Sequence, residues 1–175
     1  MALKKKYFDV TLEVLNSSIP LLAYTPESLD KRIIRFDLTK ILKGKNCEAK
    51  YLVHLKDKEL FGEIIEFSIY PSFIKKMIGH NISIIEDSFS CPCKDSKLRI
   101  KPFLITRKRV HRSVRTELRN KSKEFLVATS ENSSKEDFFK NTINGSIQKE
   151  LSRVLKKIYP LAVSELRVVK IEKKK

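Results

Sequence analysis

Hydrophobic and polar positions alternate over much of the first hundred residues, the period-two pattern of half-buried β-strands. In RIIRFDLTKIL, the apolar residues Ile34, Phe36 and Leu38 alternate with charged or polar ones. EAKYLVHL and ELFGEIIEFSIY continue the pattern around a polar KDK turn, and PSFIKKMIG then reads as one short helix beginning at Pro71. NISIIEDSFS and SKLRIKPFLIT form another expected strand pair around CPCKD, a turn by composition. Pro102 inside the last segment predicts an edge strand or a bulge.

After residue 109 the hydrophobic period changes from two to about 3.6, which predicts an amphipathic helix. Its apolar stripe consists of Val110, Val114, Leu118 and Phe125. Its basic stripe consists of Arg112, Arg115, Arg119 and Lys123. The segment therefore presents one face to a core and another, strongly cationic face elsewhere.

Two further helices are predicted near the C-terminal end. Ser133 with Glu136 three residues later suggests a capping box, and Gly145 is a typical helix stop. SIQKELSRVLKKIYP has a regular apolar stripe and ends at Pro160, and SELRVVKIEKKK returns to an extended pattern. We therefore expect an α+β fold, with a curved antiparallel β-sheet or partial β-barrel in the N-terminal part, packed with C-terminal α-helices. Without repeats or a linker, residues 1–175 are expected to form a single domain with short basic ends.

The charge balance indicates the class of partner. Lys and Arg number 37 against 21 Asp and Glu, giving a formal net charge of +16 and a pI near 9.8. A field of this sign attracts nucleic-acid phosphates first and anionic lipid second. The sequence shows neither a membrane span nor a signal peptide, and three cysteines in no framework-like spacing suit free thiols in a reducing compartment. We expect a protein of the cytosol or nucleus.

The segment RKRVHRSVRTELRNKSK concentrates this charge, since it holds eight Lys or Arg and only Glu117 as an acid. A solvated helix face mixes charges of both signs, so this one is interpreted as a surface that meets phosphates. Arginine outnumbers lysine here, which favours nucleic acid over lipid because guanidinium binds phosphate bidentately and stacks on bases. An ordinary solvated face and a membrane-surface helix are the alternatives.

The sequence predicts no metal, cofactor or catalytic site. CPC is unaccompanied by the second ligand pair of a structural zinc site, although a zinc site there is kept as an alternative. His54 and His80 are interpreted as structural or exposed, whereas His111 lies among arginines and is expected to contact phosphate. Catalytic motifs and the aromatic strand or GXXG loop of single-strand RNA modules are missing. We therefore expect a protein that is not an enzyme and that recognises RNA by shape and phosphate.

Several segments resemble the small-subunit ribosomal protein family of archaea and eukaryotes formerly numbered three-a, now eukaryotic-type protein one. The strongest match is SIQKELSRVLKKIYPLAVSELRVVKI, especially Ser146, Ile147, Lys149, the IYPL that ends at Leu161, and beyond it Arg167 and Lys170. ITRKR, the HxxVR of residues 111–115, KKYFDV and LDKRIIRFDL resemble other family segments in the same order. Relative to the family, the basic N-terminal arm and C-terminal tail are missing and the loop between RKR and HRSVR is very short.

The resemblance implies a shortened structural constituent of the small ribosomal subunit, in the cytoplasm. It would bind ribosomal RNA on the platform near the messenger exit, beside neighbouring platform proteins, with messenger RNA close by. We expect RNA contacts from Arg107, Lys108, Arg109, His111, Arg112, Arg115, Arg119, Lys123, Lys4, Lys5, Lys6, Lys173, Lys174 and Lys175. Frayed, solvated ends are the alternative for the terminal lysines. A free RNA-binding or messenger-regulating factor outside the ribosome is the alternative function.

Overall fold

The N-terminal half of the chain is built almost entirely from strands. The computed structural model describes residues 4–15, 17–42, 44–56 and 59–172. The elements of this half are β1 (Lys6–Leu12), β2 (Ser17–Ala23), the short 3-10 helix η1 (Pro26–Leu29), β3 (Ile33–Asp37), β4 (Cys47–Lys56), β5 (Glu59–Ile69) and α1 (Pro71–Met77). β3 alternates between exposed and half-buried positions, with Ile34 and Phe36 inward as predicted. The N-terminal region is thus a strand-rich sheet that ends in one short helix.

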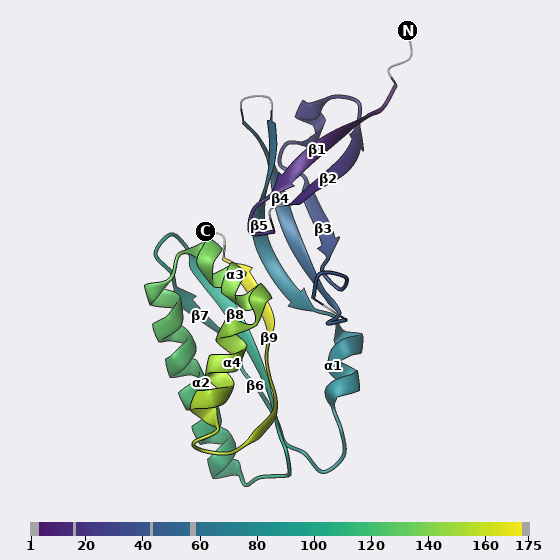
Figure 1. Ribbon diagram of the computed structural model, residues 1–175. Helices are drawn as coiled ribbons and strands as arrows, with labels where there is room; N and C mark the ends of the chain where they lie inside the picture. The colour runs from purple at the N-terminus through teal and green to yellow at the C-terminus, as the bar shows by residue number, and fades with distance from the viewer. Residues whose placement is uncertain (1–3, 16, 43, 57–58, 173–175) are drawn as a thin grey trace.

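The second half adds four strands and three longer helices. They are β6 (Ile84–Glu86), β7 (Phe89–Pro92), β8 (Lys97–Thr106), α2 (Arg112–Asn132), α3 (Lys135–Asn144), α4 (Ser146–Leu155) and β9 (Leu161–Ile171). Figure 1 shows α2, α3 and α4 on the same side of β8 and β9, while α1 lies apart from them. The predicted α+β class is confirmed, with the helices concentrated towards the C-terminal end.

The nine described strands belong to one open sheet that does not close into a barrel. Its main order is β2-β1-β5-β9-β8-β6, with β4 also pairing with β5, β3 with β4, and β7 with β8. The pairings are antiparallel except that of β1 with β5, so the sheet is mixed. β9 pairs with β5 on one side and with β8 on the other, and thereby joins the two halves of the molecule.

Several local predictions differ from the structure, among them the end of the last helix, which lies at Leu155 instead of next to Pro160. NISIIEDSFS forms two short strands instead of one, and Cys91 and Pro92 belong to β7, so the turn begins later, where the Cys93 N–H donates to the Ser96 carbonyl. Pro102 lies on β8, which has neighbours on both sides, so the edge-strand alternative is wrong and the bulge is confirmed. The N-cap of α3 is Ser134 instead of Ser133, because the Ser134 hydroxyl accepts the Asp137 N–H.

A continuous apolar core runs from the sheet to the helices. Among its largest fully buried side chains are Tyr51, Phe67, Phe103, Phe138 and Phe139. α2 packs against β7 and α4, and α4 against β9. The three cysteines are free, and burial raises the pKa of the Cys47 thiol to about 11. A thiol of such high pKa is weakly reactive at neutral pH, which suits a structural role.

Candidate nucleic-acid interface

The residues predicted to meet phosphate follow the loop before α2 and the first half of that helix. Along the chain they are the cations Arg107, Lys108, Arg109, Arg112, Arg115, Arg119 and Lys123, together with the imidazole of His111, and all of them are exposed. We call this set the α2 basic cluster. Within the described residues, none of its members takes part in an ion pair. Their charges are therefore available to an external partner.

The partial positive charge at the N-terminus of α2 is not balanced by a capping side chain or by an acidic residue in the first turn. The N-cap residue is His111, whose side chain makes no capping hydrogen bond, and the first turn contains no acidic residue. Arg112 and Arg115 lie in this region, where the helix dipole and the free N–H groups favour negative charge. Cations at this end raise the free energy of the isolated helix, and a bound anion would lower it.

Two buried hydroxyl side chains hold the loop that leads into α2. Thr106 is fully buried at the end of β8, and its hydroxyl accepts the Ser83 N–H at 3.0 Å and donates to the Lys108 carbonyl at 2.7 Å. The Ser83 hydroxyl accepts the Val110 N–H at 3.1 Å. The loop containing Arg107, Lys108 and Arg109 is thus tied to the sheet on both sides. The sequence reasoning missed this anchor, because it depends on a contact between residues more than twenty positions apart.

The buried face of α2 differs in part from the predicted apolar stripe. Leu118 is buried and Val114 and Phe125 are half-buried, but Val110 lies in the loop before the helix. Small serines complete the buried face, which consists of Leu118, Ser122, Leu126 and Ser130. The Ser130 hydroxyl donates to the Pro92 carbonyl at 2.8 Å and ties α2 to β7. These four residues recur at every fourth position. The sequence would have predicted this buried face if serines had been counted as core residues.

Lys4, Lys5 and Lys6 do not join the α2 basic cluster. Lys4, Lys5 and Lys6 are exposed, and the Lys5 ammonium lies 5.3 Å from the ring centroid of Tyr24. Figure 1 shows β1 at the opposite end of the molecule from the start of α2. Lys173, Lys174 and Lys175 lie outside the described residues. Within the cluster itself, the Lys123 ammonium lies 5.8 Å from the ring centroid of Phe89 on β7.

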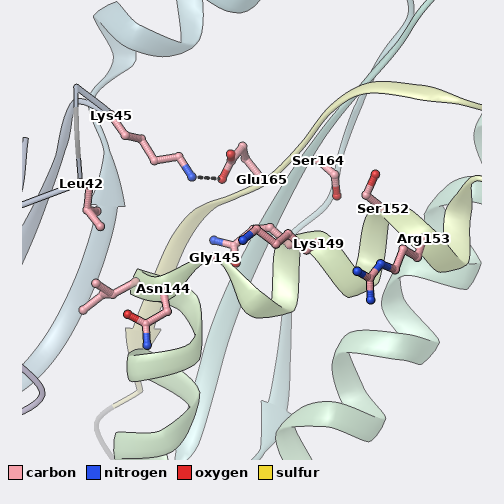
Figure 2. A pocket seen from close by; sticks show the side chains of 11 residues that line it. Leu42, Lys45, Asn144, Gly145, Lys149, Ser152, Arg153, Ser164 and Glu165 are labelled. Carbon is pink, nitrogen blue, oxygen red and sulfur yellow. Dashed lines mark hydrogen bonds and ion pairs between the residues drawn. The ribbon is translucent and has the colours of Figure 1, made fainter.

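A pocket beside the start of α4 is lined mainly by polar and basic residues. It has a volume of about 520 Å³ and lies between α4, the segment after β3, and β9. Figure 2 shows Lys45 reaching to Glu165, with 2.7 Å between Nζ and Oε2, while Lys149 and Arg153 project from α4. Its lining contains neither histidine nor cysteine, and Glu165 is its single carboxylate. Across the described ranges, no group of three or more potential ligands could hold a metal ion.

Comparison with known proteins decides the family. Residues 3–175 match the sequence profile of the ribosomal S3Ae family. The chain belongs to that family. A relative from Nanoarchaeum equitans, named small ribosomal subunit protein eS1, is 33% identical over 145 residues, which are 79% of this chain and 72% of the relative. The protein of the same name from Saccharolobus solfataricus is 28% identical over 115 residues, which are 65% of this chain and 55% of that relative.

The resemblance inferred from the sequence is therefore confirmed, and the S3Ae signature can be located in the fold. The helix before IYPL is α4, the chain then turns, and β9 begins at Leu161, as the family pattern implies. The basic strand-to-helix transition is the junction of β8 and α2. S3Ae proteins are ribosomal proteins, and none of the described helices is long and apolar enough to cross a membrane.

Proposed function

We propose that the chain is a structural constituent of the small ribosomal subunit that binds ribosomal RNA through the α2 basic cluster. Family membership supports the ribosomal role. The observation that supports the RNA contact is the exposed cluster at the start of α2, which has neither an ion-pair partner among the described residues nor an acid in the first helical turn. RNA phosphates would supply the missing negative charge at the place where the helix N-terminus favours it.

We place the protein on the platform of the subunit near the messenger exit, in the ribosomes of the cytoplasm, beside other platform proteins and close to messenger RNA. The mechanism is charge neutralisation on a preformed surface, because the loop before α2 is held by Ser83 and Thr106. Binding then orders few side chains beyond the arginines and lysines themselves, which lowers its entropic cost. Lys4, Lys5 and Lys6, and also Lys173, Lys174 and Lys175, are proposed as secondary contacts.

The residue assignment is tested by the salt dependence of RNA binding. We expect Arg112→Gln, Arg115→Gln and Arg119→Gln together to weaken binding to purified small-subunit ribosomal RNA. The plot of log affinity against log salt should flatten by about 0.7 to 0.9 per lost phosphate contact. The control variant carries Lys75→Gln, Lys76→Gln and Lys140→Gln, exposed cations on α1 and α3 with the same total charge. An equal slope change in the two variants, or none in the first, would contradict the assignment.

Residence in the ribosome is tested separately by sedimentation of the tagged chain from its own cells. Migration with the small subunit at low salt and at about half-molar salt, where weak phosphate contacts release, supports an integral component. Release at the higher salt would instead indicate a peripheral factor, and migration at the top of the gradient throughout would contradict the ribosomal role.

A further inference from the structure

A broad groove lies on the sheet, away from the start of α2. It has a volume of about 1340 Å³, and most of its exposed surface is apolar. Five strands line it, with Ile33, Arg35, Lys50, Leu52, Glu63, Ile65, Glu66, Lys97, Arg99, Lys170 and Ile171, together with Glu172 just after β9. Arg99 on β8 and Arg107 just after its end are eight residues apart, roughly 25 Å in an extended chain. The groove is therefore a second surface, distinct from the α2 basic cluster.

One row of directly opposed residues crosses this groove from β3 to β8. Strand register places its members in the order Arg35, Lys50, Glu66, Lys170 and Arg99. We call it the cross-sheet row. With strands about 4.8 Å apart, it spans roughly 19 Å. Arg35 faces Lys50, and Lys170 faces Arg99, so two pairs of like charges lie directly opposite each other. Such pairs destabilise a sheet, and an external negative group would offset the repulsion.

The carboxylates of the groove are already engaged. Glu66 pairs with Lys50 at 3.2 Å, and Glu172 pairs with Arg99 at 2.6 Å. Glu63 pairs with Lys135 of α3 and with His54. By contrast, neither Arg35 nor Lys170 has an ion-pair partner in the part of the chain that the structure describes. The groove thus presents two cations, Arg35 and Lys170, that form no ion pair within the described chain.

Aliphatic side chains lie beside the cross-sheet row. Ile33 faces Leu52 across β3 and β4, and Ile33 is 53% exposed, a large apolar side chain in contact with water. Ile65 lies on β5 at the bulge that precedes Glu66. None of the twelve lining residues, all within the described ranges, is aromatic. Single-stranded RNA is usually held by aromatic stacking, so this lining suits aliphatic protein side chains better than bases.

We propose that this groove docks an acidic segment of a neighbouring protein, with carboxylates facing Arg35 and Lys170 and aliphatic side chains lying on Ile33, Leu52 and Ile65. Charge complementarity selects the occupant, because the groove combines an apolar floor with unneutralised cations. The lysines that follow Glu172 in this chain carry the same charge as the row and are disfavoured as occupants. The inference goes beyond the RNA contact and involves none of the residues of α2.

Photocrosslinking in cells tests the occupant directly. The tagged chain is made with the photoreactive residue p-benzoylphenylalanine in place of Ile33, irradiated, recovered by its tag, and the crosslinked segment is identified by mass spectrometry. We expect a protein segment that carries at least two Asp or Glu and several aliphatic residues. Adding Arg35→Gln and Lys170→Gln should reduce the crosslink about fivefold, as expected for two lost surface charge pairs. Lys75→Gln with Lys76→Gln on α1 is the charge-matched control and should leave the yield unchanged.

Each other outcome overturns the proposal. A crosslink to RNA, to a basic or uncharged protein segment, to a second copy of this chain or to this chain's own end would each do so. A crosslink yield that is unchanged by Arg35→Gln with Lys170→Gln would do so as well. A yield no higher than that from the same photoreactive residue at Tyr7, which is 73% exposed outside the groove, also overturns it. A gradient run on the same extract separates this failure from that of the ribosomal role, since co-sedimentation with the small subunit does not depend on the crosslink.

Discussion

Gly62 permits the close approach of β1 and β5, the parallel pair that attaches the N-terminal hairpin to the rest of the sheet. A Cβ at this position would lie 2.8 Å from Cδ2 of Leu12, which is itself almost fully buried. The terminal methyl group of Leu12 would have to shift, and it lies in a closely packed core. At the residue scale, the absence of a side chain at Gly62 thus leaves the space that Leu12 occupies.

We expect Gly62→Ala to lower the free energy of unfolding by about 1 to 3 kcal/mol, the usual cost of overpacking a core. Urea denaturation followed by circular dichroism measures the change. Gly79→Ala is the matched control, because a Cβ at Gly79 would meet nothing within 4 Å. Equal unfolding midpoints for the two variants would show that the contact between Gly62 and Leu12 is not tight in solution.

At the element scale, the boundary between α2 and α3 depends on two adjacent serines with different tasks. The Ser133 hydroxyl donates to the Thr129 carbonyl and finishes α2, whereas the Ser134 hydroxyl accepts the Asp137 N–H and begins α3. We expect Ser134→Ala to lower the free energy of unfolding by about 1 kcal/mol, the typical loss of an N-cap, and Ser133→Ala to cost less. Thermal unfolding of the two variants compares them, and a larger loss for Ser133→Ala would contradict the assignment.

The same boundary shows which features the sequence could predict. Period, charge and cap residues predicted most of the strands from β3 onward, α2, the stop at Gly145 and the exposure of the α2 basic cluster, because these depend on neighbouring residues. They did not identify β1 and β2. Ser133 and Ser134 are equally suitable N-cap residues for α3 by residue type. Which of them begins α3 depends on where α2 ends, and this is set by packing. The hydrogen bond between Ser83 and Thr106 and the cross-sheet row could not be predicted from the sequence, for a related reason. Both depend on register between strands that lie far apart in the chain.

At the scale of the whole molecule, an ion pair joins the sheet to the helices and should make stability depend on pH. The hydrogen bond from Lys135 at the start of α3 lowers the pKa of Glu63 on β5 below its ordinary value of 4.5. A lowered pKa stabilises the fold above about pH 4.5, and this contribution disappears as pH falls through the folded-state value. Glu13 acts in the opposite sense, because burial raises its pKa.

We therefore expect Glu63→Gln to reduce stability near neutral pH and to have a diminishing effect as the solution is acidified below about pH 4. Urea midpoints measured at intervals of pH give the comparison. Glu27→Gln, at an exposed acid with no ion pair among the described residues, is the control and should leave the profile unchanged. A constant difference between wild type and Glu63→Gln at every pH would show that the ionised carboxylate does not provide the stabilisation.

The position of β9 between β5 and β8 has a consequence for biosynthesis. β9 is the last described strand to leave the ribosome that makes the chain, although both of its partners are formed from residues translated much earlier. Until it arrives, those partners expose unpaired backbone edges that can pair with other nascent chains. A chain that stops before Leu161 would keep these edges permanently. Premature termination of translation therefore yields an aggregation-prone product, although most of the strands are already present.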